Sequence, residues 1–403
     1  MDPRRNPFSP GAGVRPAQLA GRDELIETCE IAMDRVLNGL YANDIIMTGL
    51  RGVGKTVLLN HLVNLAKSRG METIKFEVPD ASGGHLTPAM VIALGAVLKK
   101  LDRLKKAGDG LRLAAAALQN FAAVFRVKYE GFSFGASPAR AVADSGDLET
   151  DLPELLMPVA RAAETRKTAV VLFIDEVQYL TKKELSALAR TCHEAAQQGV
   201  PFLFIGAGLP QIAALAGDAK SYAERLFLYP EVAALDDAAA RKALSAPAQA
   251  QKVKFTNGAL DRILKETDRY PYFLQTWGKF AWDTASKSPI TEADVKEANP
   301  AIIAHLDQNF FRVRFDRCTG LEQQYLRAMA ELGAGPHRTG DIAAALGTTS
   351  SKLAPVRRNL ISAGMIYSQR YGETGFTVPL FDGFMKRMLP ELEPYKPGRR
   401  SLS

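Results

Sequence analysis

The stretch GLRGVGKT at residues 49–56 decides the fold. It matches the pattern G-x-x-x-x-G-K-T and lies between a β-type run at 44–48 (DIIMT) and a run with helical apolar spacing at 57–66 (VLLNHLVNLA). This is the strand–loop–helix context that the pattern requires. The alternative, a chance glycine-rich turn, leaves both flanking elements unexplained. The stretch therefore predicts a phosphate-binding loop in an α/β domain.

The residue types of this loop explain its predicted chemistry. Three glycines let the backbone curl so that its amides point at phosphate oxygens, and the helix that begins near Lys55 adds its positive dipole end. Lys55 places a positive charge on the β- and γ-phosphates, and the Thr56 hydroxyl is a candidate ligand of Mg²⁺. We therefore expect ATP and Mg²⁺ to be bound by Gly49, Leu50, Arg51, Gly52, Val53, Gly54, Lys55, Thr56 and Val57.

A second, acidic element is expected beside such a loop, and VVLFIDEVQYL at 170–180 supplies it. Its first five residues are apolar, as in a strand that is buried on both faces of a parallel sheet. Asp175 at the end of this strand is predicted to hold Mg²⁺, and Glu176 to polarise the water that attacks the γ-phosphate. A capping role for Asp175 on the following helix is compatible with this one.

These two motifs resemble those of a known family of ATPases. GLRGVGKT and FIDEVQYL resemble the Walker A and Walker B motifs of AAA+ ATPases, where Asp is followed directly by Glu. LAGRDELIETC at 19–29 is similar to the segment with which many AAA+ proteins close over the adenine, which implies that Gly21 and Arg22 bind the nucleotide. Downstream, the chain resembles the branch related to the archaeal and eukaryotic origin-recognition ATPases.

The resemblance implies a fold and a domain order. The fold class is α/β, with a P-loop AAA+ parallel sheet flanked by helices, then a helical lid and a C-terminal winged-helix domain. ATP is expected to bind between the core and the lid. The expected parts are an N-terminal arm at 1–20, the nucleotide-binding core at 21–235, the lid at 236–305, the winged helix at 306–390 and a basic tail at 391–403.

Three further positions follow from the resemblance. AAA+ proteins usually end the strand predicted at 201–205 with a polar sensor residue, but this chain has Gly-Ala-Gly at 206–208, so the contact is missing or comes from Gln211. Arg225 is the candidate arginine finger acting on a neighbouring subunit, with a plain surface arginine as the alternative. AAA+ proteins usually have an arginine at the position after Pro271, but this chain has Tyr272 there. Arg269 is a possible substitute. Slow hydrolysis and a homo-oligomer in the ATP-bound state are therefore expected.

Other segments complete the α/β core and the lid. A second strand is predicted at 71–78, and mostly helix at 86–125. FRVKYEGFSFGAS at 125–137 alternates apolar and polar residues around Glu-Gly, which predicts an inserted β-hairpin near 125–135. Three alternatives are open for such a hairpin: it contacts DNA, it contacts a neighbouring subunit, or it packs only on its own domain. A polar loop is predicted at 137–150, and the aromatic residues at 270–282 are expected in the lid core.

The C-terminal quarter has the pattern of a winged helix. Helices are predicted at 321–332, at 340–346 with Thr339 as the cap, and at 355–363 with Pro355 at the first position, followed by strands at 365–369 and 376–378. On the third helix Val356, Leu360 and Ala363 share a face and are expected to be buried. The predicted DNA-binding residues are Lys352, Arg357, Arg358 and Arg370.

Charge supports a polyanionic partner. The net charge is +7, and residues 310–403 hold 14 Lys and Arg against 8 Asp and Glu, so double-stranded DNA is the predicted partner. Three scattered cysteines favour a reducing cytoplasm, and no segment is predicted to enter a membrane. The leading hypothesis is a nucleotide-dependent switch on DNA. The alternatives are an ATP-binding regulatory scaffold whose winged helix grips a protein, and an accessory ATPase of transposition or defence.

Overall fold

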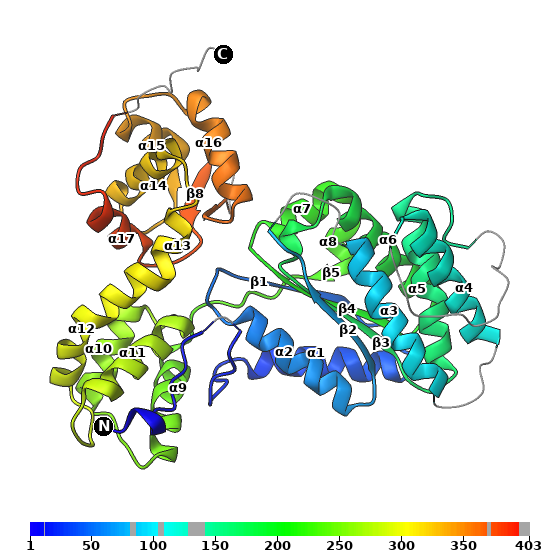
Figure 1. The fold of residues 1–403 in the computed structure, drawn as a ribbon, viewed down its shortest axis with the longest axis horizontal. Coiled ribbons are helices and arrows are strands. Elements are labelled where there is room, and N and C mark those ends of the chain that lie inside the picture. The colour runs from blue at the N-terminus through cyan, green and yellow to red at the C-terminus, as the bar shows by residue number, and fades with distance from the viewer. Residues whose placement is uncertain (12, 81–85, 104–108, 128–141, 369–371, 395–403) are drawn as a thin grey trace. The chain divides into compact units, whose positions relative to one another are not determined.

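The computed structural model describes all residues except 12, 81–85, 104–108, 128–141, 369–371 and 395–403. The chain divides into two compact units (Figure 1). The first, here called the sheet unit, comprises Arg22–Gly49 and Lys55–Val232. The second, here called the helical unit, comprises Met1–Gly21, Leu50–Gly54 and Ala233–Ser403. In the described part of the chain, no helix has the length and apolar character needed to cross a membrane.

The sheet unit is built on five parallel strands in the order β2-β3-β4-β1-β5. The strands are β1 (Asp44–Thr48), β2 (Glu72–Glu77), β3 (Val170–Asp175), β4 (Phe202–Gly208) and β5 (Phe227–Leu228). Because β1 lies between β4 and β5, the loop that follows β1 begins beside the end of β4. The carboxyl ends of parallel strands are where α/β proteins place their ligands, and both predicted motifs follow such ends.

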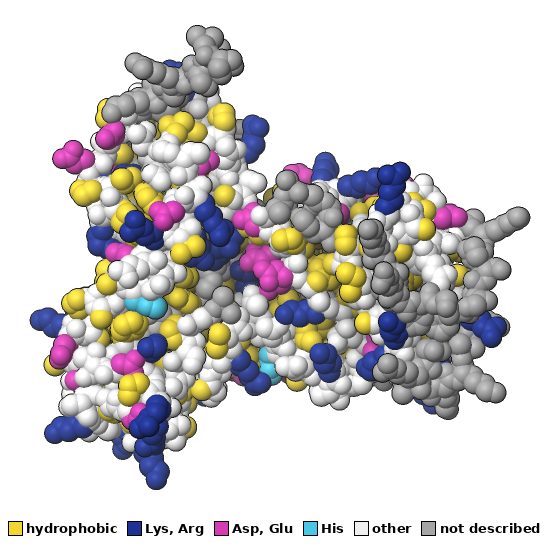
Figure 2. All heavy atoms as spheres, in the orientation of Figure 1, with side chains coloured by type: hydrophobic (Ala, Val, Ile, Leu, Met, Phe, Trp, Pro, Cys, Tyr) yellow, Lys and Arg dark blue, Asp and Glu magenta, His cyan; other side chains and the backbone are white. Residues whose placement is uncertain are grey.

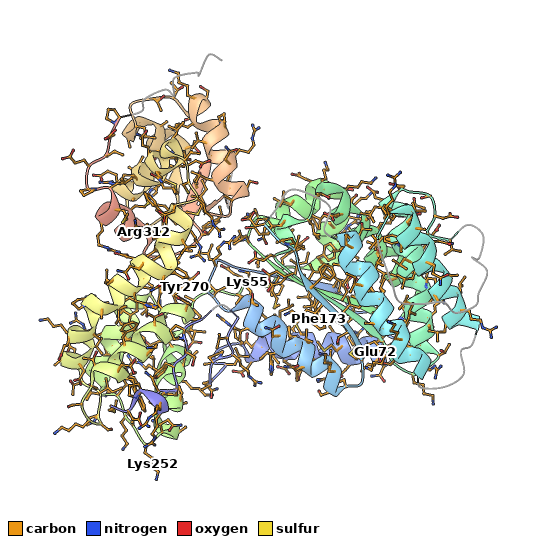
Figure 3. All side chains as sticks on the ribbon, viewed as in Figure 1. Lys55, Glu72, Phe173, Lys252, Tyr270 and Arg312 are labelled. Atoms are coloured by element: carbon orange, nitrogen blue, oxygen red, sulfur yellow. The ribbon has the colours of Figure 1, made fainter. Side chains whose placement is uncertain are left out.

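Helices cover both faces of this sheet. Alternate residues of β3, Val170, Leu172 and Ile174, share one apolar core with helices α3 to α8. The other face is covered by α1 and α2, and Phe173 belongs to it (Figures 1 and 3). The helix bounds are α1 (Asp23–Leu37), α2 (Lys55–Ser68), α3 (Leu86–Arg103), α4 (Asp109–Val124), α5 (Leu148–Glu164), α6 (Lys182–Gln198), α7 (Ile212–Ala219) and α8 (Ala223–Leu226).

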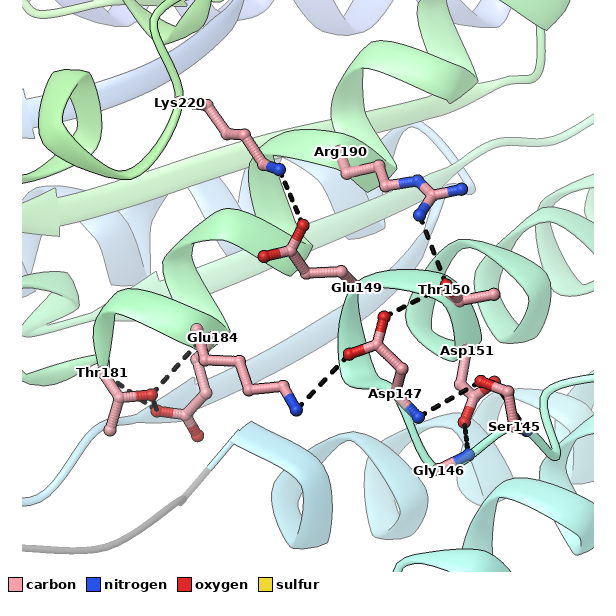
Figure 4. Close-up of polar contacts among 11 residues, drawn as sticks. Ser145, Gly146, Asp147, Glu149, Thr150, Asp151, Thr181, Glu184, Arg190 and Lys220 are labelled. Carbon is pink, nitrogen blue, oxygen red and sulfur yellow. Dashed lines mark hydrogen bonds and ion pairs between the residues drawn. The ribbon is translucent and has the colours of Figure 1, made fainter.

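Polar contacts fix the helices around β3 (Figure 4). The fully buried carboxylate of Asp151 accepts hydrogen bonds from the Ser145 hydroxyl at 2.7 Å and the Gly146 amide at 2.8 Å. At the start of α6, Thr181 and Glu184 form a reciprocal capping box. These bonds satisfy backbone groups that would otherwise be unpaired at two helix ends.

The predicted elements of the core are largely confirmed. The strand predicted at 44–48 is β1, the one at 71–78 is β2, and the apolar run at 170–174 is fully buried in β3. The strand predicted at 201–205 is longer, since β4 continues to Gly208. The predicted hairpin begins in a turn after α4, and its remainder at 128–141 lies outside the described residues.

The helical unit begins with four packed helices after residue 233. They are α9 (Asp237–Ala250), α10 (Asn257–Thr267), α11 (Pro271–Thr284) and α12 (Glu292–Leu306). The predicted aromatic core is confirmed in part: Tyr270, Phe273, Trp277 and Trp282 are buried, whereas Tyr272 and Phe280 are half-buried. A short 3-10 helix, η1 (Pro3–Arg5), precedes Phe8, which packs so tightly on α11 that a Cβ on Gly278 would lie 2.7 Å from its ring.

A π-helical turn, η3 (Asp307–Phe311), and α13 (Arg312–Phe315) lead into the C-terminal elements. These are α14 (Gly320–Leu332), β6 (His337–Arg338), α15 (Thr339–Ala345), α16 (Ser350–Ser362), β7 (Ile366–Tyr367), β8 (Glu373–Phe376) and α17 (Phe381–Met388). The three strands form an antiparallel sheet in the order β6-β8-β7. Three helices followed by a hairpin were predicted, and β6 was not.

Several details of the C-terminal prediction were wrong. Pro355 does not open a helix, because α16 begins at Ser350, and the complete burial of Leu353 stabilises this earlier start. Ala363 is exposed at the C-cap, so Leu353 takes its place beside Val356 and Leu360. Thr339 is the first residue of α15, and Arg338 is the N-cap.

The second strand of the hairpin is also displaced from its predicted position. It was expected at 376–378, but β8 runs from Glu373 to Phe376. The reason is tertiary: β8 pairs with β6 on one side and β7 on the other, so its bounds depend on two partners distant in sequence.

Candidate nucleotide-binding site

The loop at 49–56 has the backbone that a phosphate cradle needs. It starts where the Gly49 amide donates to the carbonyl of Gly208 at 3.1 Å, and it ends where α2 begins at Lys55. Gly52 and Gly54 have φ angles of 88° and 97°, a region that favours glycine. Between them Val53 is buried and anchors the loop, while Leu50, Thr56 and Val57 are partly buried.

Lys55, Thr56 and Asp175 meet at the start of α2. Lys55 lies there (Figure 3), is only 6% exposed, and donates from Nζ to the Gly49 carbonyl at 2.8 Å. Thr56 is hydrogen-bonded to the carboxylate of Asp175, at the end of β3. Burial raises the pKa of Asp175, as does the neighbouring Glu176, while the bond from Thr56 and the charge of Lys55 lower it. A hydroxyl and a carboxylate in contact beside a buried ammonium form a donor set that fits Mg²⁺ and a phosphate.

Glu176 lies directly after this carboxylate in an unusual conformation. Its φ and ψ are 55° and 42°, the left-handed region that non-glycine residues rarely adopt. Its amide donates to Asp175 Oδ1 at 2.9 Å, and its carboxylate accepts from Nε2 of Gln178 in the turn η2 (Val177–Tyr179). The other end of Gln178, Oε1, accepts from the Leu209 amide at 3.0 Å. Sequence reasoning missed Gln178, whose only signal was its position two residues after Glu176.

In the part of the chain that the structure describes, no hydrogen bond or ion pair joins the other two predicted positions, Gln211 and Arg225, to these carboxylates. Gln211 is the N-cap residue of α7, and its buried Oε1 has no hydrogen-bond partner among the described residues. Arg225 is exposed on α8, immediately before β5. Its role as an arginine finger stays a prediction.

Within the helical unit, loop residues 50–54 contact two other segments. The Tyr270 hydroxyl donates to the Arg51 carbonyl, and the Tyr272 amide donates to the Gly52 carbonyl at 3.2 Å. The Arg51 amide donates to the Thr377 carbonyl at 3.1 Å, and its Nε to the Gly364 carbonyl at 3.3 Å. Residues at the start of α11 and next to the C-terminal hairpin therefore hold this segment in place. The sequence did not predict these contacts.

The predicted adenine and lid residues lie as follows. Gly21 has a φ of 65° and packs on α9, since a Cβ there would lie 2.7 Å from that of Ala239. Arg22 is the N-cap residue of α1. Arg269 is exposed, and its carbonyl accepts from the Leu235 amide at 3.1 Å. Tyr272, where an arginine was expected, is half-buried and stacks on Phe310 at 4.5 Å between ring centroids.

The predicted DNA-binding residues differ in their surroundings. Lys352 and Arg358 are exposed on α16. Arg357 instead bonds to the hairpin, from Nε to the Thr374 hydroxyl at 3.0 Å and from Nη2 to the Ser368 hydroxyl at 2.8 Å. Arg370 lies outside the described residues. Helix α16 therefore carries two exposed basic residues, Lys352 and Arg358, whereas Arg357 is bonded to the hairpin.

Comparisons with known proteins agree with this geometry. Residues 18–205 match the family model described as an AAA ATPase domain, and residues 308–385 match a domain of unknown function, DUF8462. A Walker-type ATPase of Pyrococcus abyssi has a similar fold, with a TM-score of 0.59 at 15% identity over 92% of this chain and 97% of that one. The RuvB Holliday junction branch migration motor of Thermotoga maritima matches with a TM-score of 0.46 at 15% identity, over 96% and 100% of the two chains.

A short stretch is also similar to a curated protein. It is 43% identical over 49 residues to ORC1-type DNA replication protein 2 of Haloarcula marismortui, and the match spans 12% of each chain. Residues 18–205 therefore match an AAA ATPase domain, as the two Walker-type motifs predicted. The similarity to an ORC1-type replication protein extends over 49 residues, and it agrees with the predicted resemblance to the origin-recognition branch over that stretch.

Proposed function

We propose that this protein binds MgATP at residues 49–57 and hydrolyses it slowly to ADP and phosphate. The observation that carries the proposal is the contact of Thr56 with Asp175 beside the buried Lys55. Gly52 and Gly54, both with positive φ, precede these groups in the loop, and this glycine backbone is typical of loops whose amides bind phosphate.

Each residue then has a role derived from its chemistry. Lys55 balances the negative charge of the terminal phosphates, and Thr56 and Asp175 hold Mg²⁺, which supplies further charge neutralisation when bound. Glu176 accepts the hydrogen bond of the attacking water and so directs a lone pair towards the γ-phosphorus. Hydrolysis is expected to be slow because both sensor positions depart from the AAA+ pattern, with Gly-Ala-Gly at 206–208 and Tyr272 after Pro271.

An equilibrium binding measurement tests this proposal. Lys55→Ala is expected to weaken MgATP binding on the order of 100-fold or more, whereas Lys67→Ala, an exposed lysine of the same helix, leaves it unchanged. Equal ATP affinity in the two variants would remove the phosphate cradle.

We further propose that the C-terminal elements are a winged helix that binds double-stranded DNA when the protein holds ATP. Lys352 and Arg358 on α16 support this, as does the excess of basic residues after residue 310. On the face seen in Figure 2, Lys and Arg form several separate groups rather than one continuous stripe. Fluorescence anisotropy with a labelled duplex, with and without ATP, is the test, and binding through phosphates weakens steeply with salt.

A second function is favoured by one observation. Because Arg357 is bonded to the hairpin, α16 offers fewer free cations than its sequence indicates. A regulatory scaffold whose C-terminal domain grips a protein fits such a surface. Absence of binding to any duplex, with ATP binding intact, would favour the scaffold.

A further inference from the structure

The carboxylate of Glu176 is connected through the side chain of Gln178 to the end of β4, a strand that is distant in sequence. Glu176 itself is in the left-handed region, which is unfavourable for a non-glycine residue and persists only where its surroundings impose it. The side chain of Gln178 donates to its carboxylate and accepts from the amide of Leu209, the residue after β4. The end of β4 is therefore tied through one amide group to the residue after β3.

The side-chain amide group of Gln178 can make both hydrogen bonds in only one orientation. The Leu209 amide is a donor, so the oxygen of Gln178 must face it, and the NH₂ group must then face Glu176. An ionised carboxylate only accepts hydrogen bonds, so the NH₂ group of Gln178 is a matching partner for Glu176. The bond is made to Oε2. Among the described residues no hydrogen bond to Oε1 is present, so we assign to this oxygen the contact with the attacking water.

Gly208 makes room for this arrangement. Its backbone is not in the left-handed region, so conformational freedom does not explain the glycine. A Cβ at this position would lie 2.8 Å from Oε1 of Gln178, and the next atoms, at 3.6 Å, are at ordinary contact distance. The space at the end of β4 is thus occupied by the amide of Gln178.

We propose that Gln178 is a positioning residue for ATP hydrolysis, which orients Glu176 against the end of β4. The inference rests on the proposed function, because it assigns a partner to the carboxylate that activates water. A purely structural role, holding the turn η2 in place, is the competing explanation. The two differ in what a substitution changes: orientation of the carboxylate alters turnover, while a loosened turn alters folding stability and nucleotide affinity.

Two different substitutions test the role of the side-chain amide of Gln178. Gln178→Ala removes it, and Gly208→Ala displaces it with a Cβ while leaving Gln178 and Glu176 in the sequence. The displaced atom is the far end of a flexible side chain, so Gly208→Ala is expected to fold with a nearly unchanged unfolding temperature. Gln198→Ala, an exposed glutamine at the end of α6, is the matched control.

We expect both variants to lower single-turnover hydrolysis on the order of 100-fold, the scale of a small misplacement of a catalytic group. Affinity for MgATP is expected to match that of Gln198→Ala. Affinity for ADP with aluminium fluoride, which mimics the planar phosphoryl group and its water, is expected to fall without any turnover being measured. In a double-mutant cycle, Gly208→Ala should add nothing to Gln178→Ala, because its effect passes through the same amide.

Three results would overturn the proposal. They are unchanged turnover and aluminium fluoride affinity in both variants, a loss of MgATP affinity equal to the loss of turnover, or additive effects in the cycle. Failure of the proposed function looks different, because then Lys55→Ala would keep its ATP affinity whatever the variants of Gln178 do.

Discussion

The carbonyl oxygen of Gly52 accepts a hydrogen bond from the backbone amide of Tyr272, 3.2 Å away. The contact joins the phosphate-binding loop to the first turn of α11, and the ring of Tyr270 lies beside it. A Cβ on Gly52 would lie 3.1 Å from the Tyr270 ring and 3.3 Å from the Tyr272 Cβ, at a φ of 88°. The glycine is therefore required both by its conformation and by its neighbours.

Gly52→Ala is expected to weaken MgATP binding about tenfold or more, because the loop must shift to relieve both constraints. Gly39→Ala is the control: Gly39 has a φ of 71° with open space around it, so it incurs only the conformational cost, about 1 kcal/mol of stability. Titration calorimetry and urea unfolding measure the two effects. Equal behaviour of the two variants would show that the contacts with α11 are irrelevant to the loop.

Glu176→Gln is expected to keep MgATP affinity and to lose turnover by a factor on the order of 100 to 10,000. The amide retains the size of the carboxylate but cannot accept a proton from water, so ATP stays bound and uncleaved. Filter binding after single-turnover incubation detects the trapped nucleotide, with the exposed Glu164→Gln as the control. Undiminished hydrolysis would show that another group activates the water.

Asp44 predicts a pH-dependent stability. This carboxyl at the start of β1 accepts from the Phe204 amide at 2.6 Å, and burial raises its pKa to about 7. Between about pH 4 and that value the folded state holds a proton that the unfolded state releases, so stability falls by about 1.4 kcal/mol per pH unit as the pH rises. Above the folded pKa the loss is complete.

Asp44→Asn is expected to remove this slope, because its amide oxygen still accepts from Phe204 and does not titrate. Urea unfolding at pH 5, 6, 7 and 8 checks the difference against Asp80→Asn, an exposed carboxylate. A slope that persists in Asp44→Asn would assign the pH dependence to other groups.

Adjacent arginines of α16 are expected to behave differently. Arg357→Ala removes the bonds to Thr374 and Ser368 and is expected to cost about 2 kcal/mol of stability. Arg358→Ala is expected to change stability by less than about 0.5 kcal/mol. If the domain binds DNA, Arg358→Ala should also reduce the slope of log affinity against log salt by about 1. Thermal unfolding and anisotropy on both variants separate holding the hairpin from contacting phosphates.

Local signals predicted the nucleotide-binding elements well. The order of β1, loop and α2 follows from a short apolar run, glycines at fixed spacing and a helical apolar pattern, all within 25 residues of one another. The buried strand β3 and the two acids at its end were predicted equally well. The bounds of the C-terminal elements were predicted less well, because the strand that begins at Glu373 depends on pairing with β6 and the start of α16 depends on burial of Leu353.

The sequence by itself determined that a phosphate-binding loop and an acidic strand end exist, because glycine conformation, charge and apolar runs act over a few residues. Only the tertiary structure decided what surrounds them. The bridge from Glu176 through Gln178 to Leu209 spans two strands, and the bonds from Tyr272 and Thr377 reach the loop from distant parts of the chain. Such contacts depend on how strands and helices meet in space, and no spacing along the chain encodes them.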